Sequence, residues 1–222
     1  MSRKIIGVTV GTPRNLGGFA TKQDIEDLRA DMNYAPIEIT KISNNVGTVE
    51  KGTNVTEMTV TWTLSKTPKS QTLDGVALGV DVRSKKVDMT GKTSVTLVVT
   101  DERDHTVSKS TGYTAYSGVY YGAIDAGAVI NKDAINALAV KHQSGLTGTF
   151  KFTAKAGQKL TFAAPVSYGE PSTFVIGGLD YIWTKLTPFE HENASGFKTN
   201  YNVWQNDEVI TGDRTLDITV KK

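Results

Sequence analysis

The chain has 222 residues, of which 25 are Lys or Arg, 23 are Asp or Glu and none is Cys. Because the opposite charges nearly cancel, the composition argues against a nucleic-acid-binding protein. The lack of cysteine excludes disulfides, Cys-ligated zinc and a Cys nucleophile. No run of 18 apolar residues occurs, so we expect no membrane insertion. A chain of this length can hold one large domain or two of ordinary size.

The first 19 residues, MSRKIIGVTVGTPRNLGGF, have no amphipathic period long enough to build a core. Residues 5–10 fit a short strand, which could add to the sheet edge of a partner through main-chain hydrogen bonds. Terminal segments of this kind are poorly ordered unless something ties them down. We therefore predict an anchoring arm that lies against another protein. Its expected contact residues are Ile5, Ile6, Val8, Val10, Pro13, Leu16 and Phe19.

A short amphipathic helix is predicted after the arm. Thr21 is a suitable N-cap, Asp24 suits the positive end of the helix dipole, and Pro36 prevents the helix from continuing. Three turns are too few for a helix that is stable alone in water. Its apolar stripe either packs on the chain's own β-domain or forms the seam of a self-associating bundle, with a trimer favoured. The stripe consists of Ile25, Leu28 and Met32, spaced i, i+3 and i+7.

From residue 37 onward the apolar period changes to two, which indicates half-buried strands. Gly, Pro, Asn and Asp separate these strands at near-regular spacing, as in an antiparallel sandwich. We expect an Ig-like β-sandwich over residues 37–112, with Trp62 as its core anchor and a turn over 101–104. Its clearest predicted strands are Met58–Leu64, Val76–Val82, Val95–Val99 and Val107–Tyr113.

A second β-rich module is predicted over residues 113–222. It begins with a strand over 119–121 that Gly122 closes, and it includes a short helix over 133–141. The predicted fold class is therefore all-β, with an arm and short helix over residues 1–36 followed by two β-sandwich-like modules. The later predicted strands are Gly148–Ala154, Lys159–Ala164, Thr173–Gly177, Ile182–Leu186, Tyr201–Gln205 and Thr215–Val220.

A search for catalytic or metal-ligating patterns gives none that is complete. His105, His142 and His191 are far apart in the sequence and are expected in a turn, after a helix and in a loop, solvated or locally hydrogen-bonded. His191 and Glu192 begin like a zinc-protease helix, but Ser195 stands where the second His is required. We therefore expect no catalytic residues, no cofactor and no metal site.

Aromatic residues concentrate in the second module, some of them close to carboxylates. Asp180, Glu190 and Glu192 could act as glycosidase carboxylates if their separation suited the chemistry. Surface charges beside core aromatics are the ordinary case, so we expect a non-enzymatic protein. Most of the aromatic rings are expected in the core or a subunit interface, and a minority in a receptor patch. The candidates for receptor or interface contacts are Tyr120, Tyr121, Tyr181, Trp183 and Trp204.

Several phrases of the sequence, taken in order, resemble structural proteins of tailed bacteriophages. The opening KIIGVTVGTP resembles the N-terminal arm that attaches fibre and tail modules to the particle in many such proteins, especially in phages of gut bacteria. The run LVVTDERDHTVSKS resembles the Ig-like modules of phage tail proteins. GVYYG, KFTAKAGQKLTFAAP, TFVIGG, ENASGFKTNYNVWQ and LDITVKK resemble their C-terminal module. Together these phrases cover most of the chain.

The resemblance implies a non-enzymatic virion protein that assembles in the host cytoplasm. Long fibres carry repeats or trimeric shafts between arm and tip. This chain has neither, which favours a short fibre or spike, or a collar, baseplate or head-attached component. Expected partners are capsid, portal, collar or tail proteins and further copies of the chain, with a host-surface glycan as an additional candidate. The alternative hypothesis is an adhesin-like β-sandwich that binds carbohydrate or a cell surface.

Overall fold

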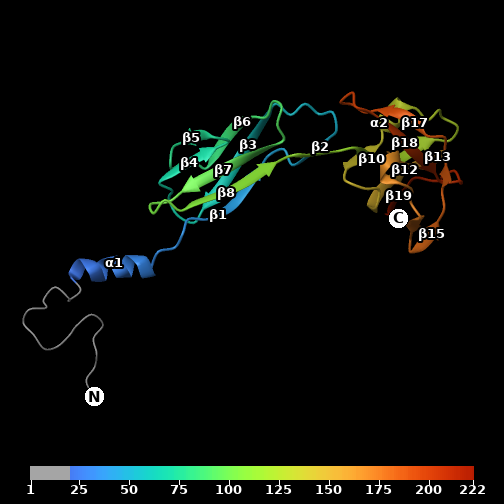
Figure 1. Cartoon of the computed structure of the whole chain (residues 1–222). Coiled ribbons are helices and arrows are strands. Elements are labelled where there is room, and N and C mark those ends of the chain that lie inside the picture. Colours follow the sequence, from blue (N-terminus) through green and yellow to red (C-terminus); the bar gives the residue numbers. More distant parts are fainter. Residues whose placement is uncertain (1–20) are drawn as a thin grey trace, which may run out of the picture.

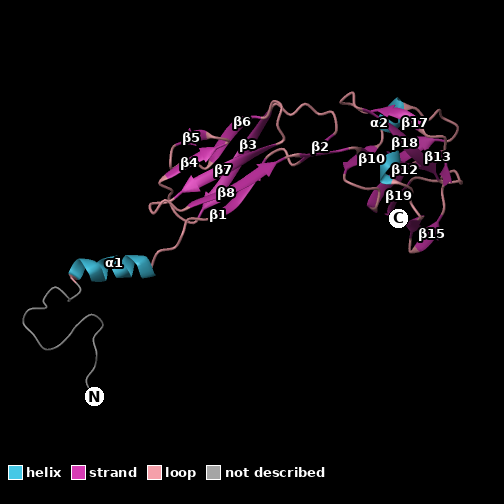
Figure 2. Cartoon of the chain, in the orientation of Figure 1, coloured by secondary structure: helices cyan, strands magenta, loops and turns pink. Residues whose placement is uncertain are grey.

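The computed structural model describes residues 21–222, so the predicted arm and its contact residues lie outside the described part. Helix α1 (Lys22–Met32) is followed in series by two β-rich modules (Figure 1). Strands dominate both modules (Figure 2), and the predicted all-β class is confirmed. Within residues 21–222, neither helix has the length and apolar content needed to cross a membrane.

Helix α1 begins where the sequence predicted. The backbone N–H of Asp24 donates to the Thr21 hydroxyl at 3.1 Å, and the Asp24 carboxylate accepts from the Thr21 backbone N–H at 2.6 Å. This reciprocal pair is a capping box, which satisfies two of the free N–H groups at a helix start. The helix ends at Met32, with Asn33 as its C-cap.

The first module is a sandwich of two antiparallel sheets. One sheet has the strand order β1-β3-β6 and the other β5-β4-β7-β8. Alternate residues of β3 point into the core, and Trp62 among them is buried as predicted. The strands are β1 (Ile39–Asn44), β3 (Glu57–Leu64), β4 (Ser70–Leu73), β5 (Val76–Leu78), β6 (Ser84–Asp88), β7 (Ser94–Thr100) and β8 (Thr106–Gly112).

The predicted strand over residues 76–82 is too long, because β5 ends at Leu78. The backbone N–H of Val82 donates to the carbonyl of Gly79 at 3.0 Å and closes a turn there. The side chain of Gln71 donates to the carbonyls of Gly79 and Val82 and holds that turn in place. Buried side-chain hydrogen bonds thus override the alternating pattern of valines.

The second module has three layers. A four-stranded sheet, β12-β19-β14-β15, packs against the sheet β11-β10-β13-β18-β16, in which β17 also pairs with β18. Helix α2 (Lys132–Asn136) covers the other face of that larger sheet, where Ile135 enters a second core cluster. The strands are β10 (Gly118–Asp125), β11 (Ala139–His142), β12 (Gly148–Ala154), β13 (Gln158–Pro165), β14 (Thr173–Ile176), β15 (Leu179–Tyr181), β16 (Thr184–Lys185), β17 (Phe189–Glu192), β18 (Lys198–Gln205) and β19 (Arg214–Lys221), with a 3-10 turn over Val166–Tyr168.

Three predictions for this module are corrected. The helix expected over 133–141 stops at Asn136, because residues 139–142 pair with the edge of β10 as β11. Gly122 does not end its strand, since it pairs with Thr161 and β10 continues to Asp125. The strand expected over 182–186 is reduced to the two residues of β16.

The two modules are joined by a short parallel pair of strands, β2 (Thr48–Glu50) and β9 (Thr114–Tyr116). β2 lies between β1 and β3 in the chain, and β9 follows β8. The junction is therefore formed by a loop from within the first module together with the segment that leaves its C-terminal end (Figure 1). The connection is therefore two-stranded and hydrogen-bonded, unlike a single flexible linker.

Candidate functional site

The apolar stripe of α1 is exposed along its whole length. The exposed fractions of Ile25, Leu28 and Met32 are 48%, 60% and 78%, and no residue of the helix is buried against the described part of the chain. The alternative in which this stripe packs on the chain's own β-domain is therefore wrong. An exposed apolar stripe on a short helix is typical of a surface that packs against another one.

The segment that follows α1 is fastened to the first module through Asp101. This fully buried carboxylate accepts hydrogen bonds from the Tyr34 hydroxyl at 2.6 Å and from the Ile37 backbone N–H at 3.1 Å. It also accepts from the backbone N–H groups of Arg103 and His105, both at 3.0 Å. Burial opposes ionisation of Asp101, but these hydrogen bonds outweigh it and hold the pKa of the carboxyl well below its usual range.

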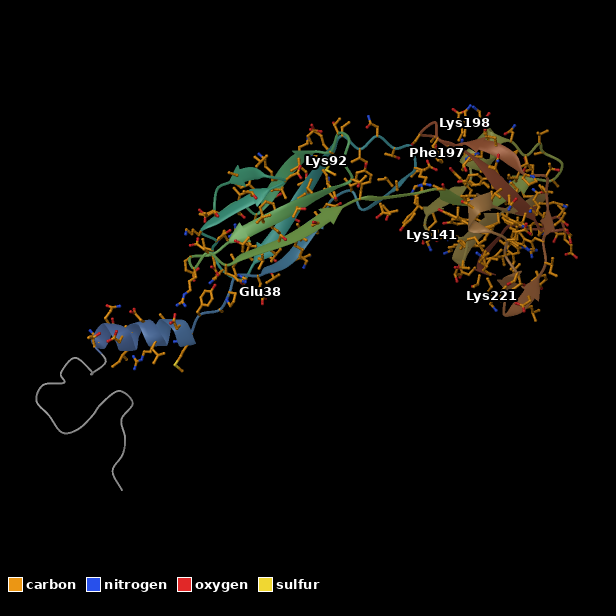
Figure 3. All side chains as sticks on the ribbon, in the orientation of Figure 1. Glu38, Lys92, Lys141, Phe197, Lys198 and Lys221 are labelled. Atoms are coloured by element: carbon orange, nitrogen blue, oxygen red, sulfur yellow. The ribbon has the colours of Figure 1, made fainter. Side chains whose placement is uncertain are left out.

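The junction between the modules is held by polar contacts. Glu50 accepts a hydrogen bond from the Tyr120 hydroxyl at 2.7 Å, and the Asn193 side chain donates to the Lys51 carbonyl at 2.8 Å. The Lys51 ammonium lies 5.6 Å from the centre of the Phe197 ring, which Figure 3 places on the side of the second module that faces the first. These contacts fix the direction of the second module relative to β2.

His191 lies beside this junction. It is buried in β17, which corrects the prediction of a solvated or locally hydrogen-bonded His in a loop. Its ring centre is 4.8 Å from that of Tyr201 and 5.0 Å from that of Tyr120, and neither of its ring nitrogens has a hydrogen-bond partner among residues 21–222. Burial lowers the pKa of His191, and the charge of Glu50 opposes this only in part. The imidazole is therefore neutral at pH 7.

A pocket of about 300 Å³ opens on the second module beside the hairpin β14–β15. Its buried floor includes Leu160, Trp183 and Ile210, and its rim includes Tyr181, which is 44% exposed, and Ile182, which is 86% exposed. Three charged side chains also line it: Asp207, Glu208 and Arg214. In Figure 1 β15 lies at the end of the molecule that is remote from α1.

The structure separates the five candidate aromatic residues. Tyr120, Trp183 and Trp204 are buried, so the expectation of surface contacts is corrected for these three, although Trp183 also lines the pocket. Tyr121 is partly buried and packs against Phe150 and Phe152. Tyr181 alone among the five is exposed. Tyr120 and Tyr121 are adjacent on β10, so their side chains face opposite sides of the sheet. Each side of this sheet packs against a core, and neither ring is left on the surface.

The carboxylates considered for glycoside chemistry are engaged in surface ion pairs. Asp180 lies 3.8 Å from the Lys221 ammonium, and Glu190 and Glu192 each lie 3.9 Å from that of Lys198. In the described part of the chain, no group of three His, Cys, Asp or Glu side chains is placed to hold a metal ion.

The chain matches no family model, no curated protein and no solved structure.

Four residues of these sites were not identified from their sequence pattern: Glu50, Asp101, Glu208 and Arg214. Asp101 had a usable signal, since it begins the acidic turn DERD directly after a buried strand, where an Asp side chain often accepts from following N–H groups. Glu50 gave no such signal, because its partner Tyr120 is 70 residues away. Glu208 and Arg214 line the same pocket because the loop after β18 hydrogen-bonds back to β13.

Proposed function

We propose that the chain is a non-enzymatic structural protein of a tailed-bacteriophage particle. It forms a short oligomeric fibre or spike, or a tail, baseplate or head-attached component. Its first 20 residues dock on another virion protein, and its second module projects outward for host attachment. The Ig-like description of the first module belongs to this proposal and is supported by seven antiparallel strands in sheets of three and four.

The single observation that carries the proposal is the exposed stripe of α1. The spacing of Ile25, Leu28 and Met32 places them at heptad positions a, d and a, the positions that meet in a coiled coil. The occupant that best fits this stripe is the same helix of another copy, because the neighbouring charges are complementary. Asp24 then falls at a g position and Arg29 at the next e position.

These charges also select the orientation of the helices. In a parallel bundle a g residue faces the following e residue of its neighbour, which brings Asp24 against Arg29 of another copy. In an antiparallel pair g faces g and e faces e, which would set acid against acid and base against base. A parallel bundle places all arms at one end and all second modules at the other. The Ile–Leu pattern alone also suits two strands, and the trimer is favoured by the resemblance to phage fibres.

Light scattering coupled to gel filtration tests this assembly. The full chain is expected to run as an oligomer, and Leu28→Lys is expected to be monomeric because it places a charge in the seam. Ala30→Lys is the matched control, since it adds the same charge at position f, away from the seam. A monomeric full chain, or a Leu28→Lys variant that remains oligomeric, would contradict the proposal. Removal of residues 1–20 should leave the oligomer intact and abolish its incorporation into particles.

The alternative, an adhesin-like β-sandwich that binds carbohydrate or a cell surface, is favoured by a separate observation, the pocket that carries Tyr181. The two functions differ in what the arm does. An adhesin module retains its full activity without residues 1–20, whereas the virion protein loses its place in the particle.

A further inference from the structure

We propose that the pocket beside β14–β15 binds a single neutral or amino-sugar pyranose ring of a cell-surface polysaccharide. This inference rests on the proposed function, because it names the ligand class that the outward module would recognise.

The apolar part of the pocket suits the carbon–hydrogen face of a sugar ring. The floor is made by buried side chains, including Leu160, Ile210 and Trp183, and the exposed side chain of Tyr181 stands at the rim. Trp183 is itself held firmly, because its ring stacks on Phe174 at 4.1 Å with an interplanar angle of 7°. An aromatic wall over a rigid apolar floor is the arrangement that small-molecule sites commonly use.

The polar part of the pocket has unused hydrogen-bonding capacity. No hydrogen bond or ion pair joins the Glu208 carboxylate to residues 21–222, and the two Nη atoms of Arg214 likewise have no partner there. Asp207 accepts a hydrogen bond from the Thr184 hydroxyl through one oxygen, which orients the carboxylate and leaves its second oxygen available. Acceptors and donors therefore line the pocket together.

The loop that carries these acids is fixed before any ligand arrives. The Asn206 side chain accepts from the Leu160 backbone N–H at 2.6 Å and donates to the Glu208 carbonyl at 2.5 Å. The Ile210 backbone N–H donates to the Gln158 carbonyl at 2.8 Å. A loop held at both ends loses little conformational entropy on binding.

The mixture of groups decides among ligand classes. A purely apolar side chain of a protein partner would fill the floor but would strip water from Glu208 and Arg214 without replacing their hydrogen bonds. A purely ionic ligand would cover Trp183 and Ile210 with no apolar match. A pyranose ring has apolar faces and a hydroxyl edge, so it satisfies both. Two carboxylates against one guanidinium disfavour acidic sugars.

The test is saturation-transfer NMR on the full chain with a panel of glycosides as probes. The panel contains methyl glycosides of glucose, galactose and mannose, N-acetylglucosamine, glucosamine and glucuronic acid. At least one neutral or amino sugar is expected to bind. Loss of the ring in Tyr181→Ala should weaken that binding by about tenfold, whereas Tyr181→Phe should retain it. Glu208→Gln should weaken it severalfold, and Glu190→Gln, an equivalent change outside the pocket, should leave it unchanged.

Three results would overturn the proposal: no binding by any glycoside at about 10 mM, a concentration that reveals millimolar affinity; binding that Tyr181→Ala does not weaken; or binding of glucuronic acid alone. Displacement of a bound glycoside by a short apolar peptide with higher affinity would also overturn it in favour of a protein anchor. Light scattering on the same samples separates this outcome from failure of the assembly, because an intact oligomer that binds no sugar refutes only the pocket.

Discussion

Replacement of His191 by Phe is expected to stabilise the second module, although the position is fully buried. In neutral imidazole one ring nitrogen is a donor and the other an acceptor, and neither has a partner among the described residues. An unsatisfied buried polar group costs about 1–3 kcal/mol. Phe keeps a flat ring between Tyr120 and Tyr201 and removes both groups, at the expense of a slightly larger volume in a packed site. We expect a net gain of about 1–2 kcal/mol in the free energy of unfolding near pH 7.5.

The pH dependence gives a second measure that is less sensitive to packing. Burial lowers the pKa of His191 in the folded state, so below about pH 6.5 the unfolded chain binds a proton that the folded chain does not. The free energy of unfolding is therefore independent of His191 protonation above that pH and decreases as the pH falls below it, with a limiting slope of about 1.4 kcal/mol per pH unit. In His191→Phe this component of the slope should disappear.

Urea unfolding between pH 5 and 8 measures both effects. Fluorescence of Trp183 and Trp204 reports on the second module in a Trp62→Phe background, which removes the signal of the first. His105→Gln is the control, because His105 is exposed and its replacement should leave the stability unchanged. A His191→Phe variant that is less stable than wild type by more than about 1 kcal/mol would refute the assumption that the ring nitrogens are unsatisfied. A variant that keeps the wild-type slope below about pH 6.5 would refute the neutral state of the imidazole.

Two further changes test the connections at either end of the first module. Asp101→Asn should lower the melting temperature of that module and release Tyr34. The difference in melting temperature between this variant and wild type should be larger at pH 7 than at pH 3. The lowered pKa of the Asp101 carboxyl gives stability that is complete above about pH 4 and declines as the pH falls below it. Calorimetry at both pH values measures the difference. Gly52→Ala should loosen the junction, since its φ is +91° and an added Cβ would lie 2.7 Å from that of Phe197. Gly47→Ala, with φ +67° and open space around it, is the control for backbone strain alone, and limited proteolysis at the junction compares the two. Equal cleavage of both glycine variants would argue against a close contact at Gly52.

The sequence was sufficient to predict the class of fold and most of its strands, because alternation along a half-buried strand is a local property. Residues 57–64 and 94–100 alternate without interruption, and both were recognised. The capping box at Thr21 was also predictable, since its partners are three residues apart. Where the local pattern competed with a long-range contact, the prediction failed. Residues 139–142 form a strand because β10 offers an open edge, and the sequence of that segment alone favours a helix.

The candidate sites were less predictable than the fold, because their members come from distant segments. Tyr181 was named as a candidate together with Trp183, yet the structure places one on the surface and the other in the floor beneath it. Nothing in the amino-acid composition distinguishes the exposed residue, Tyr181, from the buried one, Trp183. Ile182 begins the strand predicted over 182–186, but it lies outside β16 and is 86% exposed at the pocket rim.

The two proposed sites, the seam of α1 and the sugar pocket, each compensate for the weak binding of the other. Helix α1 has 11 residues, which gives a short seam and an oligomer that dissociates on dilution, and the pocket has room for little more than one sugar ring, which gives low affinity to a single copy. A parallel bundle directs every second module to the same side, and the two-stranded junction keeps each module in a fixed direction. Several weak sites held together in this way bind a multivalent surface about 10²–10⁴-fold more tightly than one site does, without any new contact. The seam would in turn be reinforced when the arms are anchored side by side, because docking raises the effective concentration of the helices. Leu28→Lys should therefore reduce binding to a polysaccharide surface far more than binding to a free monosaccharide.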